Sequence, residues 1–419
     1  MMALLKSINN LIAHHQLRLL NLIALLVFII VVARMGFPSK EIMFVSPDAG
    51  GYLEVGNWLF GGAETDYTRI RPFLYPLVLK VLMSIGGVWA VWVVQVSLWL
   101  AAVNLIYLSI QRITFNNKAA LFGGLICAFN ISALSLAYHA LSEELTIFLV
   151  GIFTYIVAKN FRENPVGLFH GMLLILVLLT LVKPVFFALS LVWLILALPV
   201  YMIAEYKRKP AQLTVLFLIL IPLMIQLSMM ISKYDIYNVS EIGNHSFRYY
   251  LFAQTYSVIN ELDIEVARTT IDPYTKDEML AYAWDNIGAF VARYWLNIKQ
   301  NVNAGAVYLY YPIDYPVLKT FMSNANHLYS WIHSLFVIPV VLIALRCLAQ
   351  DRKKLLLILC LAIPCYYIIF SSGVSFTQGD RLVILSLPLW IVLYTLVYVQ
   401  IAKMSKKQRI DLLKLKFKE

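Results

Sequence analysis

Three acidic residues stand at boundaries between polar and strongly apolar sequence. Asp48 lies in SPDAGGYL, and Glu143 and Glu144 lie in ALSEEL, directly before an apolar run. A carboxylate at a membrane boundary is a candidate functional group, because a charge there is costly to keep. We predict that these three carboxylates are catalytic. The structural alternatives are that Asp48 caps a helix starting near Tyr52 and that the glutamates stabilise a helix N-terminus capped by Ser142.

Four cations accompany these acids. Arg69 and Arg71 precede PFLYPL, Lys183 interrupts the apolar run LVKPV, and Arg381 opens the last apolar run. Arginine presents a planar fork that can form two parallel hydrogen bonds with a phosphate. A lone cation in apolar sequence is costly unless it meets an anion. We predict that the four cations bind the phosphate of an anionic donor lipid; the alternative is ordinary anchoring to lipid headgroups.

Further polar and aromatic side chains in the same segments are candidates for substrate binding. They are Tyr52, Glu54, Asp66, Tyr75 and His139. Aromatic side chains with a polar tip suit the faces of sugars as well as the membrane interface. The histidines, acids and four cysteines show no metal-ligand spacing, so we predict no metal site and no required cofactor; a divalent metal is not indicated by the sequence, and metal dependence stays open.

The composition is that of a membrane protein. The chain has 419 residues, of which 61% are hydrophobic and 14% charged, whereas soluble domains are roughly 45–50% apolar and about 25% charged. Apolar runs of about 18 or more residues recur along the whole length, as spanning helices require. We therefore expect an all-α polytopic membrane protein. The net charge of +11 does not indicate a nucleic-acid partner, because Lys and Arg sit in short loops between apolar runs.

The apolar pattern predicts about ten transmembrane helices. The expected spans are 18–37, 88–110, 119–138, 145–159, two short helices within 166–204 that break at Lys183–Pro184, 212–232, 327–346, 354–371 and 382–402. Residues 72–87 contain Pro72 and Pro76 and are expected to form an interfacial or half-inserted helix. Residues 233–325 form the one long polar region, rich in Tyr, Asn and Trp. We expect this region to bind the acceptor and to gate the site. The alternative is a membrane-surface helix anchored by Trp and Tyr.

The loop charges predict the orientation. Basic residues cluster in alternate loops and in the C-terminal tail, which places both termini in the cytoplasm. We expect three regions: an N-terminal transmembrane catalytic module, 1–232, whose first outer loop is 38–87; an outer-face region, 233–325; and C-terminal transmembrane helices with a basic tail, 326–419. The acids then gather on the outer face, which we expect to be the periplasmic side of a bacterial inner membrane.

Together these elements resemble the GT-C superfamily of membrane glycosyltransferases, which includes the protein O-mannosyltransferases and the lipid A aminoarabinose transferases. The resemblance rests on the order of the motifs: an acid in the first outer loop, the pattern D…YL…W…GG…R…RPFLYP, acids at the next outer turn, a Lys-Pro break, and DRL…SLPL opening a late span. It covers residues 18–400. It implies a GT-C fold and a role in modifying lipopolysaccharide or another glycan of the cell envelope.

The resemblance also implies a chemistry. The donor would be a sugar on a polyprenyl phosphate, and the acceptor a glycan, a lipid or a protein among the surrounding membrane lipids. Asp48 would be the general base of an inverting transfer through an oxocarbenium-like transition state. The cations would stabilise the leaving phosphate. Because apolar surface flanks Asp48, we expect its pKa to be raised, which would suit a base.

Two other functions fit the same sequence. One is a polymerase or ligase of lipid-linked oligosaccharides, which would also need outer-face cations. The other is a non-enzymatic flippase or transporter of lipid-linked sugars. Transport predicts charges at mid-membrane depth and often internal repeats, whereas the charges here lie mainly at span ends and no useful repeat is present. The pattern therefore favours an interfacial enzyme.

Overall fold

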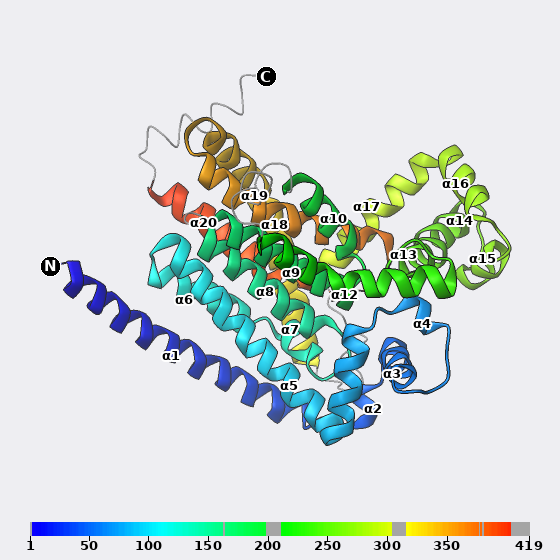
Figure 1. Cartoon of the computed structure of the whole chain (residues 1–419), viewed down its shortest axis with the longest axis horizontal. Helices are drawn as coiled ribbons and strands as arrows, with labels where there is room; N and C mark the ends of the chain where they lie inside the picture. The colour runs from blue at the N-terminus through cyan, green and yellow to red at the C-terminus, as the bar shows by residue number, and fades with distance from the viewer. Residues whose placement is uncertain are drawn as a thin grey trace.

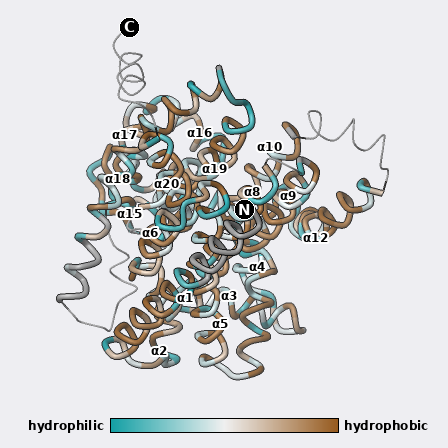
Figure 2. The backbone as a smooth tube through the Cα atoms, turned by 90° about the vertical axis from the view of Figure 1, so that its left-hand side faces the viewer, coloured by the Kyte–Doolittle hydropathy of each residue, from teal (hydrophilic) through white to brown (hydrophobic). Residues whose placement is uncertain are grey.

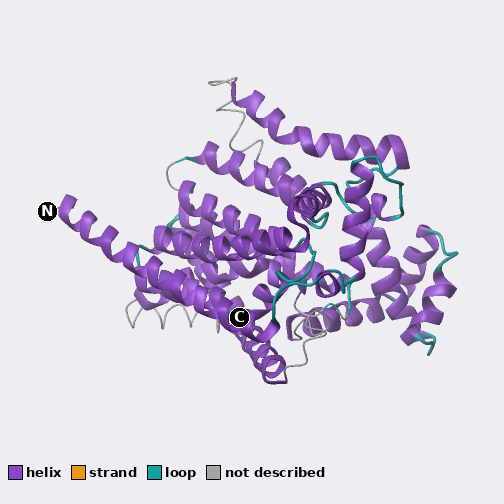
Figure 3. Cartoon of the chain, turned by 90° about the horizontal axis from the view of Figure 1, so that it is seen from below, coloured by secondary structure: helices purple, strands orange, loops and turns teal. Residues whose placement is uncertain are grey.

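The computed structural model describes residues 2–161, 164–197, 211–303, 316–376, 378 and 381–403. Within these residues helices are the only regular elements (Figure 3). The basic loop expected at 207–209 and the basic tail from 404 onward lie outside the described residues. The all-α prediction is confirmed for the described part of the chain.

The described helices fall into a long-helix bundle and a group of shorter helices at one end (Figure 1). The N-terminal helices are α1 (Met2–Met35), α2 (Lys40–Met43), α3 (Pro47–Leu59), α4 (Tyr67–Ile70), α5 (Leu74–Thr114), α6 (Asn117–Ala128), α7 (Ile131–Leu136), α8 (Glu143–Asn160), α9 (Pro165–Val182), α10 (Phe186–Ala197) and α12 (Ala211–Tyr234). The group of shorter helices consists of α13 (Ile242–Ser246), the π-helix η2 (Phe247–Phe252), α14 (Ala253–Ile259), α15 (Ile264–Ile271), α16 (Lys276–Asp285) and α17 (Ile287–Asn303). The C-terminal helices are α18 (Pro316–Gln350), α19 (Arg352–Ser371), the 3-10 turns η4 (Ser372–Val374) and η6 (Ile384–Ser386), and α20 (Leu387–Lys403).

Six helices in the described part of the chain are long and apolar enough to cross a membrane. Their spanning segments are His15–Met35, Leu74–Thr114, Ala211–Tyr234, His327–Leu348, Arg352–Val374 and Ile384–Lys403. Shorter apolar helices cover Asn117–Ala128, Val166–Val182 and Phe186–Leu196. Hydrophobic residues dominate the long helices (Figure 2). The architecture is thus that of a polytopic membrane protein, with six long spans where the sequence predicts about ten.

Glycines bring the N-terminal helices into close contact. A Cβ added to Gly123 of α6 would lie 2.2 Å from Cδ1 of Ile110 in α5, and one added to Gly124 would lie 2.5 Å from Leu20 in α1. Small residues at such positions let helix backbones approach and gain van der Waals contact, which drives helix association in membranes. The short helix α6 is therefore wedged between α1 and α5.

Helix α5 is broken near its first third. Gly86 and Gly87 have non-helical backbone angles, and Gly87 has a φ of +60°, a conformation that side chains with a Cβ rarely adopt. The break falls where the sequence predicts the segment 72–87 to end and a span to begin at Val88. One glycine pair thus separates the part of α5 that packs against α3 from the part that forms the long span.

The expected span over 119–138 is not one helix. Helix α6 ends at Ala128, and Asn130 starts α7, because its Oδ1 accepts a hydrogen bond at 2.9 Å from the backbone N–H of Ala133. An asparagine that caps a new helix also interrupts the old one. The prediction of a continuous span is therefore wrong here, whereas the break expected at Lys183–Pro184 is confirmed between α9 and α10.

The shorter helices have a small core of their own. Phe252 is fully buried, and its ring centroid lies 5.6 Å from that of Phe290 and 5.5 Å from that of Tyr282. Two hydrogen bonds link this group to α4: the N–H of Glu241 donates to the carbonyl of Arg69 at 2.9 Å, and Ser240 Oγ donates to the carbonyl of Ile70. The links place α13 beside α4.

Candidate functional site

Asp48 lies in the first turn of α3 and faces two arginines. The helix begins at Pro47, the residue before Asp48, so the expected helix start near Tyr52 is wrong. Proline suits the first position of a helix. The carboxylate of Asp48 forms ion pairs with Arg71 and with Arg381, whose Nη2 lies 2.7 Å from Asp48 Oδ2. The side chain therefore binds cations and does not cap the helix.

Glu143 is the second carboxylate of this group. It is fully buried at the start of α8, where the helix dipole favours a negative charge. Arg381 Nε donates to its Oε1, and Lys183 Nζ lies 3.1 Å from the same oxygen. Arg381 therefore bridges Asp48 of α3 and Glu143 of α8.

Backbone breaks bring Lys183 and Arg381 to this point. Lys183 ends α9 in an extended conformation with φ −136° and ψ 110°, as expected for a residue that precedes a proline. Arg381 stands just before the turn that leads into α20, and only 5% of its side chain is exposed. Lys183 thus lies just past the end of α9 and Arg381 lies ahead of α20, and both side chains reach Glu143.

The ion cluster, which we define as Asp48, Arg71, Glu143, Lys183 and Arg381, carries an excess of positive charge. It contains three cations and two carboxylates within the described part of the chain. Its members are mostly withdrawn from water: the side chain of Asp48, the most accessible of the five, is 31% exposed. A buried charge is stable only when it is compensated. The formal surplus of one positive charge favours binding of an anion.

The arginines set the ionisation of Asp48. Burial alone would raise the pKa of this carboxyl, but the charges of Arg71 and Arg381 outweigh burial and hold the pKa well below its usual range. The prediction of a raised pKa is therefore wrong. The physical reason is that the flanking groups are cations and not the apolar surface that the sequence suggests. Asp48 is a carboxylate at neutral pH.

Aromatic residues line one side of the ion cluster. The guanidinium of Arg71 lies 4.7 Å from the ring centroid of Tyr52, and the rings of Tyr52 and Tyr75 meet edge to face at 4.8 Å. A cation over an aromatic face is held electrostatically. Both tyrosines, predicted as substrate-binding residues, are thus placed at the cluster.

Sequence reasoning missed two polar residues that hold this wall in place. The hydroxyl of Ser142 is 3.0 Å from that of Tyr52 and makes no cap bond to α8, so only its position at the N-cap was predicted correctly. Gln95, in the apolar interior of α5, donates at 3.2 Å to the hydroxyl of Tyr75 and at 3.0 Å to the carbonyl of His139. An amide inside an apolar run is the signal that could have identified Gln95, because such a group must find partners.

The remaining predicted residues lie outside the ion cluster. Arg69 pairs with Asp66 at 2.8 Å and approaches Glu241 at 3.9 Å. Glu54 is exposed on α3. His139 is buried, with Nδ1 3.1 Å from the carbonyl oxygen of Ile42. Of the adjacent pair Glu143 and Glu144, only Glu143 binds the cations; both carboxylate oxygens of Glu144 are buried without a hydrogen-bond partner among the described residues.

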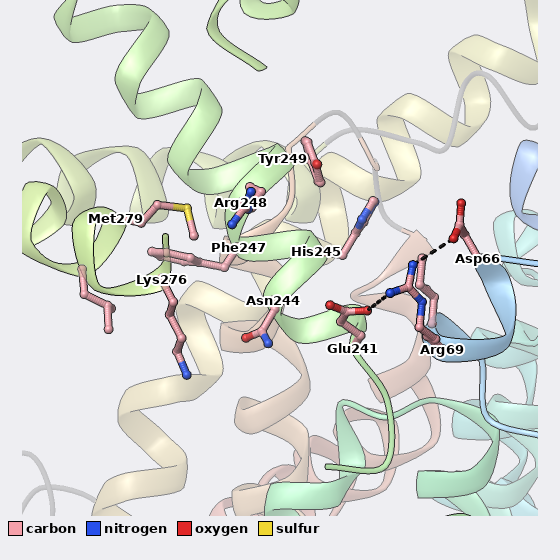
Figure 4. Close-up of a pocket in the computed structure, with 12 residues that line it drawn as sticks. Asp66, Arg69, Glu241, Asn244, His245, Phe247, Arg248, Tyr249, Lys276 and Met279 are labelled. Carbon is pink, nitrogen blue, oxygen red and sulfur yellow. Dashed lines mark hydrogen bonds and ion pairs between the residues drawn. The ribbon is translucent and has the colours of Figure 1, made fainter. Parts of the chain in front are cut away.

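A cavity of about 640 Å³ lies between α4 and the shorter helices (Figure 4). Its lining residues are Asp66, Arg69, Ile70, Glu241, Asn244, His245, Phe247, Arg248, Tyr249, Lys276, Met279 and Leu280. Asp66, Arg69 and Glu241 form one side, and Lys276 and Met279 lie on the opposite side (Figure 4). Polar and aromatic groups thus surround a space large enough for a sugar unit or more.

The cavity and the ion cluster are neighbours. Arg69 and Ile70 line the cavity, while Arg71, the next residue, pairs with Asp48. The pKa of His245, in the cavity wall, is lowered by burial and then by the charge of Arg71. One short backbone segment therefore contributes residues both to the cavity and to the ion cluster.

The described residues contain no group of three or more His, Cys, Asp or Glu side chains placed to hold a metal ion. Comparisons with protein-family models, with curated proteins and with solved structures give no match to this chain. The ion cluster and the adjoining cavity are therefore the features from which a function is inferred.

Proposed function

We propose that the protein is a membrane glycosyltransferase that uses a sugar linked to a polyprenyl phosphate. The observation that supports this proposal most strongly is the ion cluster, which combines two carboxylates with a surplus of cations at the ends of apolar helices. A lipid-linked phosphate needs cations at this kind of boundary. A sugar transfer needs, in addition, a carboxylate beside them, and Asp48 fits that need.

Arg71, Lys183 and Arg381 bind the donor phosphate in this proposal. Arginine suits a phosphate because its planar fork can form two parallel hydrogen bonds. The phosphate leaves as an anion, so it needs positive charge and no general acid. Glu143 keeps Arg381 and Lys183 in place through Oε1, which both cations share. Arg69, held by Asp66 and Glu241, belongs to the cavity and not to the phosphate site.

Asp48 acts as the base. It accepts the proton of an acceptor hydroxyl while the hydroxyl oxygen bonds to the anomeric carbon. The bond between that carbon and the phosphate oxygen breaks, and its electrons remain on the phosphate. With Arg71 and Arg381 as partners, Asp48 is a weak base. An incoming phosphate competes for the same arginines, which loosens their hold on Asp48 and strengthens it as a base when the donor is present.

The cavity beside α4 receives the acceptor. Carbohydrates are recognised by planar polar side chains together with aromatic faces, and the cavity offers Arg69, Asn244, His245 and Tyr249. The cavity is lined by Arg69 and Ile70, which adjoin Arg71 in the chain, and this favours an acceptor site near Asp48. In this proposal the acceptor is a glycan, lipid or protein of the bacterial cell envelope, and the site faces the periplasm across the inner membrane, with both termini in the cytoplasm.

The substitution Asp48→Asn tests the proposal. The glycan product should disappear, while the lipid-linked sugar should still reach the outer leaflet. Asp235→Asn is the matched control: Asp235 is exposed, and its left-handed φ of 53° is one that asparagine adopts readily. Full transfer by the Asp48→Asn variant would exclude Asp48 as the base. Loss of outer-leaflet lipid-linked sugar would instead indicate a flippase.

A further inference from the structure

The helices α16 and α17 carry an exposed apolar stripe. It consists of Leu280 and Trp284 on α16 and of Ile287, Val291 and Trp295 on α17. Residues four apart lie on one face of a helix, and each of the two helices repeats the spacing. Trp284 is 78% exposed and Trp295 is 53% exposed. Exposed apolar side chains that repeat along one face of a helix mark an interaction surface.

A neighbouring face of α17 is bonded to the end of a membrane span. The hydroxyl of Tyr294 donates to the carbonyl of Phe370, the last residue but one of α19, at 2.6 Å. The buried amides of Asn297 and Asn301 donate to the carbonyls of Gly373 and Ser372 at 3.1 and 2.9 Å. These bonds fix α17 at the level where α19 ends. A helix at this level lies at the boundary between hydrocarbon and water.

The stripe continues onto the outer surface of that span. The ring of Trp295 meets the ring of Phe370 edge to face, with centroids 5.6 Å apart. Phe370 is itself exposed, as are Leu359 and Ile363 farther along α19. In a spanning helix, exposed apolar side chains of this kind face lipid. The lipid that covers these α19 side chains therefore also reaches Trp295.

We infer that α16 and α17 lie in the membrane–water interface with the stripe in contact with lipid. Tryptophan is enriched at this depth because its ring is apolar and its N–H is polar, and amphipathic helices bury their apolar face there. Continuity with the lipid-facing surface of α19 identifies the occupant as bilayer lipid and not a second copy of the chain.

This placement has a consequence for the cavity. Lys276, Met279 and Leu280 of α16 line it, and Leu280 also belongs to the exposed stripe. The wall of the cavity is therefore part of a helix that lipid contacts on another face. The cavity consequently lies at the depth of the lipid headgroups, whatever reaction its ligand undergoes.

Site-directed spin labelling tests the inference. Cysteines are introduced singly at Trp284, Ile287, Val291 and Trp295 of the full chain, which is labelled with a nitroxide and placed in phospholipid nanodiscs. The four native cysteines are buried, so the unsubstituted chain supplies the background. Collision rates with oxygen, which concentrates in lipid, are compared with those of a nickel chelate, which stays in water. Cysteines at the exposed residues Asp285 and Ala289 are the controls, since they lie off the stripe by about 100° and about 200° of helix rotation.

We expect oxygen collisions to exceed nickel collisions several-fold at the stripe, and the reverse at the controls. Nickel accessibility at the stripe equal to that of the controls would show that the surface faces water and would overturn the inference. Low accessibility to both reagents would show a protein partner and would overturn it equally. Four equivalent positions keep the test decisive if one labelled variant does not elute like the unsubstituted protein.

Discussion

The guanidinium Nη2 of Arg381 lies 2.7 Å from Oδ2 of Asp48, and Nε of the same side chain donates to Glu143. One arginine, which stands before the turn that leads into α20, thus joins the first turn of α3 to the start of α8. A donor phosphate that binds Arg381 must share it with both carboxylates. In the proposed function, the phosphate competes with Asp48 for this arginine. Substitutions in the ion cluster should therefore affect donor binding and sugar transfer differently.

The substitution Asp48→Asn should separate sugar transfer from donor binding. We expect transfer to fall by about 10²–10⁴-fold, the usual contribution of a general base. The affinity for polyprenyl phosphate should stay the same or rise, because an anion that competes for Arg71 and Arg381 has been removed. Turnover and equilibrium binding are measured on the same preparation. Parallel loss of both would show that Asp48 only maintains the site.

The substitution Lys183→Met should weaken phosphate binding. A hydrogen bond to a charged group contributes about 1.5–3 kcal/mol, so we expect the affinity for polyprenyl phosphate to fall roughly ten-fold or more. Binding of polyprenol, which lacks the phosphate, should not change. Lys80→Met is the matched control, since Lys80 also lies in an apolar helix but donates to Asn57 at 2.8 Å. Equal effects on polyprenol and on its phosphate would contradict the role of Lys183.

The neighbouring glutamates should differ in their effect on stability. Glu143→Gln removes the charge that Arg381 and Lys183 share, and breaking a buried ion pair costs about 3–5 kcal/mol. Glu144→Gln replaces a buried carboxyl group whose oxygens have no hydrogen-bond partner in the described residues, so we expect little loss of stability or a gain. Thermal unfolding in detergent compares the two variants. A larger loss of thermal stability for Glu144→Gln than for Glu143→Gln would refute the assignment of Glu143 as the glutamate that binds the cations.

The sequence predicts much of the helix arrangement but not which charged side chains pair. Apolar runs locate α12, α19 and α20, and the Lys183–Pro184 break follows from proline geometry. Sequence alone could not choose Glu143 over Glu144, because adjacent residues on a helix point about 100° apart and the choice depends on the angle at which α8 packs. Nor could the sequence show that Arg71, and not Arg69, pairs with Asp48.

Long-range contacts account for the wrong pKa prediction. Apolar sequence surrounds Asp48 locally, which suggests burial without compensation. The compensating charges of Arg71 and Arg381 come from other segments and are brought in by the packing of α3 against α5 and of α20 against α8. The pairing therefore depends on tertiary structure, which a single sequence does not reveal.

The dependence of transfer on pH should differ between free and donor-bound protein. The pKa of Asp48 is held below its usual range by Arg71 and Arg381 in the free protein, so kcat/KM should show no acid limb from Asp48 above about pH 4. In the donor complex the phosphate competes for these arginines, so the acid limb of kcat should lie at higher pH. A limb of kcat/KM near pH 6 that Asp48→Asn removes would contradict this account.

The same shift in pKa predicts how acid affects stability. A carboxyl whose pKa is lowered by folding stabilises the folded state above its unfolded pKa of about 3.9, and this contribution is lost as the pH falls through the folded pKa. The difference in unfolding temperature between the unsubstituted protein and Asp48→Asn should therefore be constant from pH 5 to 7, within the limits set by other groups, and should shrink below about pH 4. A difference that disappears already near pH 6 would argue against the arginine pairing.

Two adjacent glycines of α3 should respond differently to the same change. A Cβ added to Gly51 would lie 2.5 Å from the ring of Tyr67, whereas one added to Gly50 meets nothing within 4 Å. Gly51→Ala should therefore cost about 1–3 kcal/mol of stability by overpacking. Gly50→Ala should be neutral or stabilising by up to about 1 kcal/mol, because alanine favours the helix. Thermal unfolding of both variants checks the packing of α3 against α4.

The most direct test of the central claim is the binding of a lipid phosphate. The full chain in nanodiscs is titrated with polyprenyl monophosphate and, separately, with polyprenol of the same length. We predict saturable binding of the monophosphate at least about ten-fold tighter than that of polyprenol, in line with the contribution of a charged hydrogen bond, with this preference lost in Arg381→Gln and reduced in Lys183→Met. Equal binding of the two lipids, or a preference that both variants retain, would contradict the account.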